Sequence, residues 1–309
     1  MNKNLRIIYM GTPEFAVPAL ELLVENGWDI VGVITAPDKP RGRGQKLIPS
    51  PVKEAALKLD LNILQPTNLK SPEFQEELRA LKADLQIVVA FRMLPESVWN
   101  MPPLGTFNLH ASLLPNYRGA APINWAIING DTETGVTTFF LKHEIDTGSI
   151  IYQEKTPILA EDDLGSVYEK LMTLGSKLVL KTVEDIAEDK VQALPQDESK
   201  AIHHAPKIFK ENGEIDWNKS AESIHNLVRG LSPYPAAWTR FDDKVCKIYK
   251  TKFDPAKETN KAIGEIQTDN KTYLKVQTGE GVLELLELQL EGKKRMKVDD
   301  LLRGYKFGS

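Results

Sequence analysis

The sequence predicts an α/β protein with two domains: a mostly parallel, Rossmann-like sheet comes first, and a smaller all-β domain follows. The length of 309 residues suits two domains better than one. Apolar strand-like segments alternate with helical patterns in the first half, which is typical of a three-layer α/β domain. Short β-like runs at the spacing of a small barrel or sandwich fill the last third. We therefore expect a first domain at 1–187, a linker at 188–208 and a second domain at 209–309.

The first element is a short apolar strand over Leu5–Met10, which ends at Gly11-Thr12-Pro13. Apolar residues then recur at helical spacing until Gly27, and a second strand covers Ile30–Thr35. A strand, a helix and a strand joined by short turns predict a right-handed parallel unit. The first turn lacks the Gly-x-Gly-x-x-Gly pattern, which argues against an NAD-binding oxidoreductase.

Residues 36–49 interrupt this alternation with three prolines, two glycines and four cations: Lys39, Arg41, Arg43 and Lys46. We expect an irregular, exposed loop. Its charge has two interpretations: a solvated connection, or a segment that contacts the phosphates of a nucleic acid.

Two helices after this loop begin with the same signal, a serine cap followed by proline at the first helical position. These signals are Ser50-Pro51 and Ser71-Pro72. The strongly apolar run Leu85–Ala90 predicts a central strand. The remaining elements of this half are expected at 62–64, 95–99, 105–110, 122–129, 135–141, 150–153 and 164–186.

The strand predicted at 105–110 carries a polar pair. Side chains alternate along a strand, so Asn108 and His110 face one side and Phe107 and Leu109 the other. An irregular segment follows, and the rim where strands end and loops begin is where open α/β sheets bind ligands. An amide can donate to a developing oxyanion, and an imidazole can donate to it or move a proton near neutral pH.

A carboxylate can complete this set. Asp146 stands directly before Thr147-Gly148, in a tight turn after a strand-like run, from which it can reach the same sheet edge. There it would fix the tautomer of the imidazole and support its cation. The alternative is purely structural: a sheet-end hydrogen-bond network for Asn108 and His110, and a turn cap for Asp146.

Composition limits the other classes of function. The net charge is -4 with 41% hydrophobic residues, so contact with a nucleic acid requires local basic patches. Residues 205–309 have a net charge of +3, from 19 Lys and Arg against 16 Asp and Glu, with the densest cluster at 293–297. The single cysteine, Cys246, and the isolated pair His203-His204 argue against a disulfide framework and a metal site. No signal peptide or membrane-spanning run is visible, so we expect a cytoplasmic protein.

The polar pair and its surroundings resemble the folate-dependent formyltransferase family. The similar motifs are Asn108-x-His110, the segment Ser112–Gly119 and Asp146-Thr147-Gly148. Nearly the whole chain takes part in the likeness. Gly11-Thr12-Pro13, the loop at 37–44 and the segment 231–238 are similar to the members that act on methionyl-tRNA. The chain differs at 91–92, where it has Phe-Arg and family members often have Tyr-Gly.

The resemblance implies a transfer of the formyl group of 10-formyltetrahydrofolate to the α-amino group of methionyl initiator tRNA, by a monomer without a metal. It also implies that the second domain is an OB-like β-barrel that binds tRNA. Asn108 and His110 would hold the formyl oxygen, and Asp146 would pair with His110. The expected folate-binding residues are Phe91, Arg92, Met93, Leu94, Ser112, Leu113, Leu114 and Pro115. The expected tRNA-binding residues are Lys39, Arg41, Arg43, Lys46, Lys293, Lys294, Arg295 and Lys297.

Three other functions remain to be separated from this one. A sugar-nucleotide N-formyltransferase would use the same chemistry on a different amine, and the basic loop and the segment 231–238 argue against it. An NAD-binding oxidoreductase would bind nicotinamide. A non-catalytic RNA-binding module would have no activity for a substitution of His110 to remove.

Overall fold

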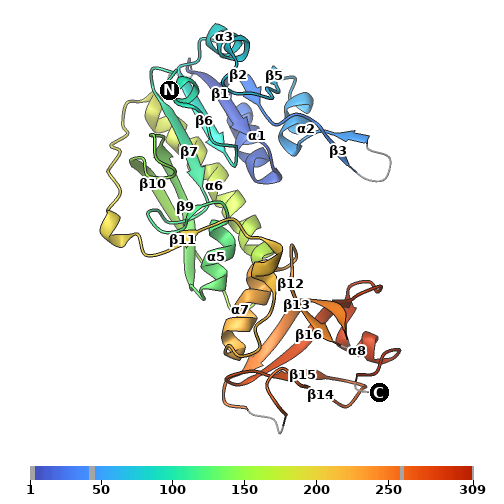
Figure 1. Ribbon diagram of the computed structural model, residues 1–309. Helices are drawn as coiled ribbons and strands as arrows, with labels where there is room; N and C mark the ends of the chain where they lie inside the picture. The colour runs from blue at the N-terminus through green and yellow to red at the C-terminus, as the bar shows by residue number, and fades with distance from the viewer. Residues whose placement is uncertain (1–3, 42–45, 242, 258–260, 308–309) are drawn as a thin grey trace. The chain divides into compact units, whose positions relative to one another are not determined.

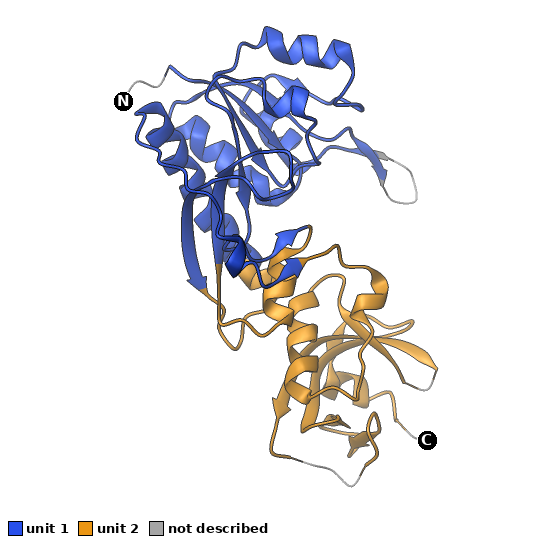
Figure 2. Cartoon of the chain, turned by 60° about the vertical axis from the view of Figure 1, so that its left-hand side comes forward, with its two compact units in different colours: residues 1–119, 135–156, 168–204 blue, residues 120–134, 157–167, 205–309 orange. Residues whose placement is uncertain are grey.

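The computed structural model describes residues 4–41, 46–241, 243–257 and 261–307. Two compact units make up the chain (Figure 2). The first unit comprises residues 1–119, 135–156 and 168–204, and the second comprises residues 120–134, 157–167 and 205–309. We describe each unit by itself.

The first unit is built on a seven-stranded sheet of order β10-β9-β7-β6-β1-β2-β5 (Figure 1). Neighbouring strands from β5 to β7 are parallel, and β9 runs antiparallel to β7. The predicted mostly parallel, Rossmann-like sheet is therefore confirmed. The strands are β1 (Arg6–Gly11), β2 (Asp29–Ile34), β5 (Ile63–Leu64), β6 (Leu85–Val89), β7 (Thr106–His110), β9 (Glu133–Phe140) and β10 (Ile150–Pro157).

The helices next to this sheet begin where the sequence predicts them. The Ser50 hydroxyl accepts a hydrogen bond from the Lys53 N–H at 3.1 Å, and the Ser71 hydroxyl accepts one from the Phe74 N–H at 3.3 Å. Each cap contributes about 1 kcal/mol to helix stability. The helices are η1 (Glu14–Ala16), α1 (Val17–Glu25), α2 (Pro51–Lys58), α3 (Pro72–Ala80), α4 (Glu96–Trp99) and α6 (Leu164–Ala187).

The basic segment after β2 is more regular than predicted. It contains β3 (Lys39–Arg41) and β4 (Lys46–Ile48), which pair with each other in antiparallel register, Lys39 opposite Ile48. The expectation of an irregular loop is therefore wrong for these residues. Prolines argue against strands in the interior of a sheet, but this two-stranded ribbon consists of edges, where Pro40 loses no obligatory partner. Arg43 lies outside the described residues.

The second unit is a curled antiparallel sheet of order β12-β13-β16-β15-β14, with β17 beside β16. The register between β13 and β16 shifts around Lys250, and such irregularities bend a strand. The predicted small β-barrel is confirmed in class, although β14, β17 and α8 were not predicted. The strands are β12 (Ala237–Phe241), β13 (Lys244–Asp254), β14 (Ile266–Thr268), β15 (Leu274–Gln277), β16 (Val282–Leu290) and β17 (Met296–Lys297).

Helices α5 (Pro122–Ile128), α7 (Ala221–Leu231) and α8 (Val298–Leu302) complete this unit. Helices α5 and α7 pack closely because Gly230 has no side chain: a Cβ there would lie 2.6 Å from Cγ1 of Ile128. Asn124 also donates to the Gly230 carbonyl at 2.8 Å. The remaining elements of the chain are β8 (Arg118–Gly119), η2 (Glu198–Lys200), β11 (His204–Ala205) and η3 (Lys210–Gly213). Within the described ranges, no helix has the length and apolar character that crossing a membrane requires.

Candidate active site

Strand β7 holds the polar pair in the interior of the sheet, between β6 and β9 (Figure 1). The predicted alternation is confirmed, because Phe107 and Leu109 are buried on the opposite face from Asn108 and His110. Helix α6 covers the Leu109 face at close range: a Cβ on Gly175 would lie 2.7 Å from Cδ2 of Leu109. Asn108 and His110 therefore share the face of β7 that is opposite to helix α6.

The side-chain amide of Asn108 has unused hydrogen-bond donors and acceptors. Its side chain is half-buried, and no hydrogen bond from its amide to any described residue is present. A half-buried amide without a protein partner is available to a ligand, because its polar atoms otherwise depend on water. The amide can therefore donate to an oxygen atom that develops negative charge.

His110 is 7% exposed, and both of its ring nitrogens have defined surroundings. Nε2 lies 2.8 Å from the carbonyl oxygen of Tyr117, which can only accept, so Nε2 carries a proton. Nδ1 faces Oδ2 of Asp146 at 3.9 Å. Nδ1 is therefore the ring nitrogen that is left to accept a proton, and it faces the carboxylate.

Asp146 is held in place through its side chain and its backbone. Its Oδ2 accepts a hydrogen bond from the Gly119 N–H at 3.0 Å, and its carbonyl accepts one from Nε2 of Gln196 at 2.8 Å. Gln196 also donates to the Gly148 carbonyl at 2.9 Å. Glycine is required there, because a Cβ on Gly148 would lie 1.6 Å from the Phe140 carbonyl oxygen. The predicted approach of Asp146 to the end of β7 agrees with this geometry.

Gln196 was not predicted to belong to the site, and it lies in the segment interpreted as a linker. Its Oε1 accepts from the Arg118 guanidinium, which also forms an ion pair with Glu198 at 2.7 Å and lowers the pKa of that carboxyl. The residues around 196–198 therefore connect the loop after β7 with the turn that carries Asp146. No local sequence pattern marks Gln196, because its role arises only from tertiary contacts.

The segment after β7 has a fixed shape. The Ser112 hydroxyl, fully buried, donates to the Asn116 carbonyl at 2.7 Å. Thr137 of β9 donates to the Ser112 carbonyl at 2.6 Å and accepts from the Leu114 N–H at 3.2 Å. Among the four residues expected here to bind folate, Leu113 alone is half-buried rather than buried. Residues 112–115 shape the loop beside His110, and the surface that they present next to His110 is mainly apolar.

The other predicted folate-binding segment follows β6 and thus begins beside the end of β7, since Val89 pairs with Leu109. Its side chains differ strongly in exposure: Leu94 is 8% exposed and Met93 is 70% exposed. The Arg92 guanidinium donates to the carbonyls of Pro66 and Thr67. Arg92 therefore binds backbone of the same unit, and its expected contact with folate stays a prediction.

The predicted tRNA-binding residues lie in two separate places. In the first unit, Lys39, Arg41 and Lys46 belong to β3 and β4. In the second unit, Lys293, Lys294 and Lys297 are exposed near β17. Arg295 differs from these lysines, because it forms a bidentate ion pair with Glu287 at 2.8 and 2.9 Å and lies over the Tyr249 ring at 4.2 Å: its charge is already partly neutralised.

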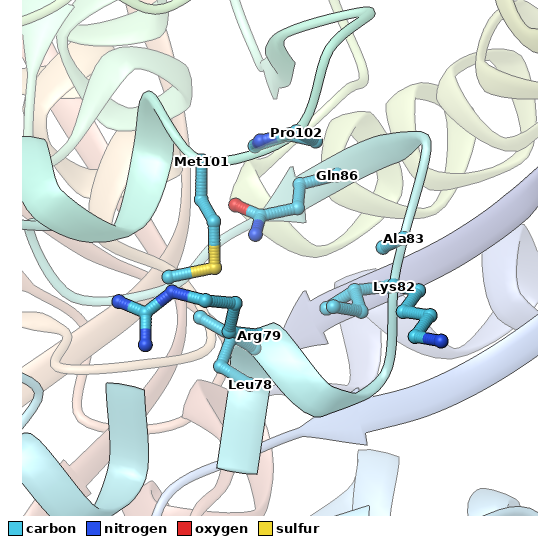
Figure 3. Close-up of a pocket in the computed structure, with 8 residues that line it drawn as sticks. Leu78, Arg79, Lys82, Ala83, Gln86, Met101 and Pro102 are labelled. Carbon is cyan, nitrogen blue, oxygen red and sulfur yellow. The ribbon is translucent and has the colours of Figure 1, made fainter. Parts of the chain in front are cut away.

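A cavity of about 160 Å³ lies elsewhere in the first unit, near the beginnings of β1 and β6. Figure 3 shows Arg79, Gln86 and Met101 around it. Because β1, β6 and β7 are parallel, this cavity is at the opposite end of the strands from His110. It is therefore separate from the candidate site.

Comparisons with known proteins show which family the chain resembles. Residues 3–183 match the family described as formyl transferase, and residues 207–306 match the formyl transferase C-terminal domain. A protein of Bacteroides fragilis named methionyl-tRNA formyltransferase is 58% identical over 98% of this chain and 96% of its own length. A protein of the same name from Flavobacterium johnsoniae is 54% identical over 99% of this chain and 98% of its own.

Two solved structures share the fold at lower identity. An N-formyltransferase from Helicobacter canadensis, in complex with folinic acid and dTDP-3-aminofucose, has a TM-score of 0.69 and 22% identity, over 91% of this chain and 99% of its own. HypX from Aquifex aeolicus, in complex with tetrahydrofolic acid, has a TM-score of 0.65 and 18% identity, over 97% of this chain and 47% of its own.

Proposed function

The chain belongs to the formyl transferase family, and from this we propose that it transfers the formyl group of 10-formyltetrahydrofolate to the α-amino group of methionyl initiator tRNA. The product would be the N-formylmethionyl-tRNA that starts translation. We choose this acceptor because the chain is similar to methionyl-tRNA formyltransferases along its full length, including the second unit. The formyl-folate is a co-substrate: 10-formyltetrahydrofolate is consumed in each cycle, and tetrahydrofolate is released.

The reaction begins when the amine nitrogen attacks the formyl carbon and the carbonyl oxygen becomes an oxyanion. Asn108 supports this step as the donor to that oxygen, because its amide has no partner among the described residues. The attacking amine must lose a proton, and Nδ1 of His110 is the ring position that can accept it. The formyl carbonyl then re-forms as the bond to N10 of the folate breaks, and N10 takes up the proton that His110 received, which returns the imidazole to its neutral form.

Asp146 supports the charged state of His110. A carboxylate 3.9 Å from Nδ1 stabilises the imidazolium that forms when the amine proton arrives. The positive charge of the imidazolium also stabilises the negative charge of the oxyanion electrostatically. The hydrogen bonds of Asp146 to Gly119 and Gln196 keep the carboxylate in place through the cycle, so no reorganisation is needed at the moment of reaction.

The basic residues are proposed to bind the phosphates of the tRNA. Lys39 and its neighbours in the hairpin would do so in the first unit, and Lys293, Lys294 and Lys297 would do so in the second unit, each unit taken by itself. Binding of this kind weakens steeply as the salt concentration rises, and a flat salt response would contradict it. We further propose that the protein acts as a monomer in the cytoplasm, where charged tRNA is available.

An acceptor exchange tests this function. The protein is incubated with 10-formyltetrahydrofolate and either methionyl initiator tRNA or an amino-sugar nucleotide, and the formylated product is identified by mass spectrometry. We expect N-formylmethionine from the tRNA and no formylated sugar. The sugar nucleotide is the right competitor, because a structural neighbour was solved with one. Formylation of the sugar alone would refute the proposed acceptor.

A further inference from the structure

The charged guanidinium of Arg92 is bound by backbone carbonyl oxygens. Two of its nitrogens donate to backbone carbonyls, Nη1 to Thr67 at 3.0 Å and Nη2 to Pro66. No carboxylate forms an ion pair with it among the residues that the structure describes. Partial burial lowers the pKa of the guanidinium, which nevertheless stays charged at neutral pH. A cation is thus held by neutral backbone oxygens at the carboxyl end of the sheet.

These contacts join two segments that are distant in the sheet. Arg92 follows β6, and Pro66 and Thr67 follow β5, with β1 and β2 between them. Three strand spacings amount to about 14 Å. Segment 91–94 and the Arg92 side chain together span this distance. The guanidinium also lies 5.6 Å from the centre of the Phe91 ring.

We propose that Arg92 is a positioning residue, which fixes segment 91–94 as one wall of the folate site without contacting the folate itself. The fork of its guanidinium reaches both carbonyls at once, so the segment has one preferred position over the sheet edge. This inference rests on the proposed function, because it requires that segment 91–94 faces the formyl-folate. The arginine at position 92 thus has a structural use.

The test is the equilibrium binding of tetrahydrofolate, measured by calorimetry on the full chain. We expect the dissociation constant to rise about tenfold in Arg92→Ala, because segment 91–94 loses its hydrogen bonds to the loop after β5. Arg92→Lys should lose nearly as much, since an ammonium keeps the charge but cannot form the fork. The KM for methionyl-tRNA should stay unchanged in both. Wild-type affinity in Arg92→Lys would overturn the proposal.

A second ligand separates positioning from direct contact. A tetrahydropterin without the p-aminobenzoyl-glutamate part lacks the carboxylates to which an arginine would bind. If Arg92 positions the wall, both ligands should lose affinity by the same factor in Arg92→Ala. If only tetrahydrofolate loses affinity, Arg92 contacts the glutamate directly and the proposal is wrong.

Arg6 provides a matched control within the same unit. It also donates to two backbone carbonyls, Leu81 at 2.9 Å and Lys82 at 3.2 Å, but at the opposite end of the strands. Arg6→Ala should leave folate affinity unchanged. An equal loss in Arg6→Ala would show that any broken contact of this kind weakens binding, and would overturn the proposal. Failure of the wild-type protein to bind tetrahydrofolate would refute the proposed function instead.

Discussion

The end of β7 and the β3–β4 hairpin are both polar regions of the first unit, but they are built in opposite ways. At the end of β7, three hydrogen bonds with partners in two other segments, Tyr117–Gly119 and Gln196, fix His110 and Asp146. Among the residues that the structure describes, β3 and β4 of the hairpin pair only with each other. Near its base, Asp38 accepts hydrogen bonds from Lys53 at 2.7 Å and Gln65 at 2.8 Å, which fix where it leaves the sheet.

This difference corresponds to two kinds of task. Transfer of a group between substrates requires reacting atoms at defined distances, and a displacement of about 1 Å can cost two orders of magnitude in rate. Attraction between cations and phosphates acts over about 8 to 10 Å at physiological salt and tolerates movement. Substitutions near β7 should therefore change the rate at saturating substrate, and substitutions in the basic regions should change affinity.

The largest effect is expected from the polar pair. Asn108→Ala and His110→Ala should each lower kcat at least a hundredfold. The first removes an oxyanion donor, which is worth about 2.7 to 4 kcal/mol, and the second removes the proton acceptor, which is worth about 10² to 10⁴ in rate. Steady-state formylation at saturating substrates measures this. His204→Ala replaces an exposed histidine of the same unit and should keep wild-type kcat. A kcat within threefold of wild type in either variant of the pair would remove it from the catalytic centre.

A smaller loss of rate is expected from Gln196→Met, which keeps the size of the side chain. It removes the two hydrogen bonds that hold the turn around Asp146. We expect kcat to fall about 30-fold, or about 2 kcal/mol for two hydrogen bonds. Gln75→Met, which removes the hydrogen bond from Gln75 to Ser97, should leave kcat unchanged. An effect of Gln196→Met on tRNA affinity alone would contradict the distinction between the two regions.

Arg43→Ala tests the proposed role of the basic residues between 39 and 46. We expect the dissociation constant for methionyl-tRNA to rise about tenfold at physiological salt, with a salt dependence that is weaker by about one phosphate contact. Tetrahydrofolate binding should be unchanged. Filter binding of the tRNA at several salt concentrations provides the measurement. A loss of folate affinity with normal tRNA binding would reverse the proposed roles of the two regions.

The smallest effect is expected at the basic cluster of the second unit. Glu287→Gln removes the carboxylate that neutralises Arg295, so the arginine becomes available to a phosphate. We expect tRNA affinity to increase two- to threefold at low salt, and to decrease by a similar factor in Lys294→Ala. Unchanged affinity in both variants, measured by the same binding assay, would show that this cluster does not contact tRNA.

The sequence predicted the polar pair well because the relevant signal is local. Alternation along β7 determines that Asn108 and His110 share a face whatever the rest of the chain does. The caps at Ser50 and Ser71 were predictable for the same reason, since a cap depends on the next three residues only. The resemblance to a family then gave these residues a chemistry that periodicity alone left open.

Other features depend on contacts between distant segments and could not be predicted. The proton on Nε2 of His110 follows from the backbone carbonyl of Tyr117, an atom that every residue type possesses. Gln196 lies in a polar segment without periodicity, so nothing local separates it from its exposed neighbours. The strands of the basic hairpin were missed because proline and glycine usually indicate irregular structure, although a ribbon with two free edges accommodates Pro40.

The most direct test of this account is the single-turnover rate of formyl transfer, with folate and methionyl-tRNA both saturating, in His110→Ala and Arg43→Ala. The rate should fall at least a hundredfold in His110→Ala and should equal that of the wild type in Arg43→Ala, because saturation hides a loss of affinity but not a loss of catalysis. Equal rates in the two variants, whether both slow or both fast, would contradict the separation of catalysis from docking.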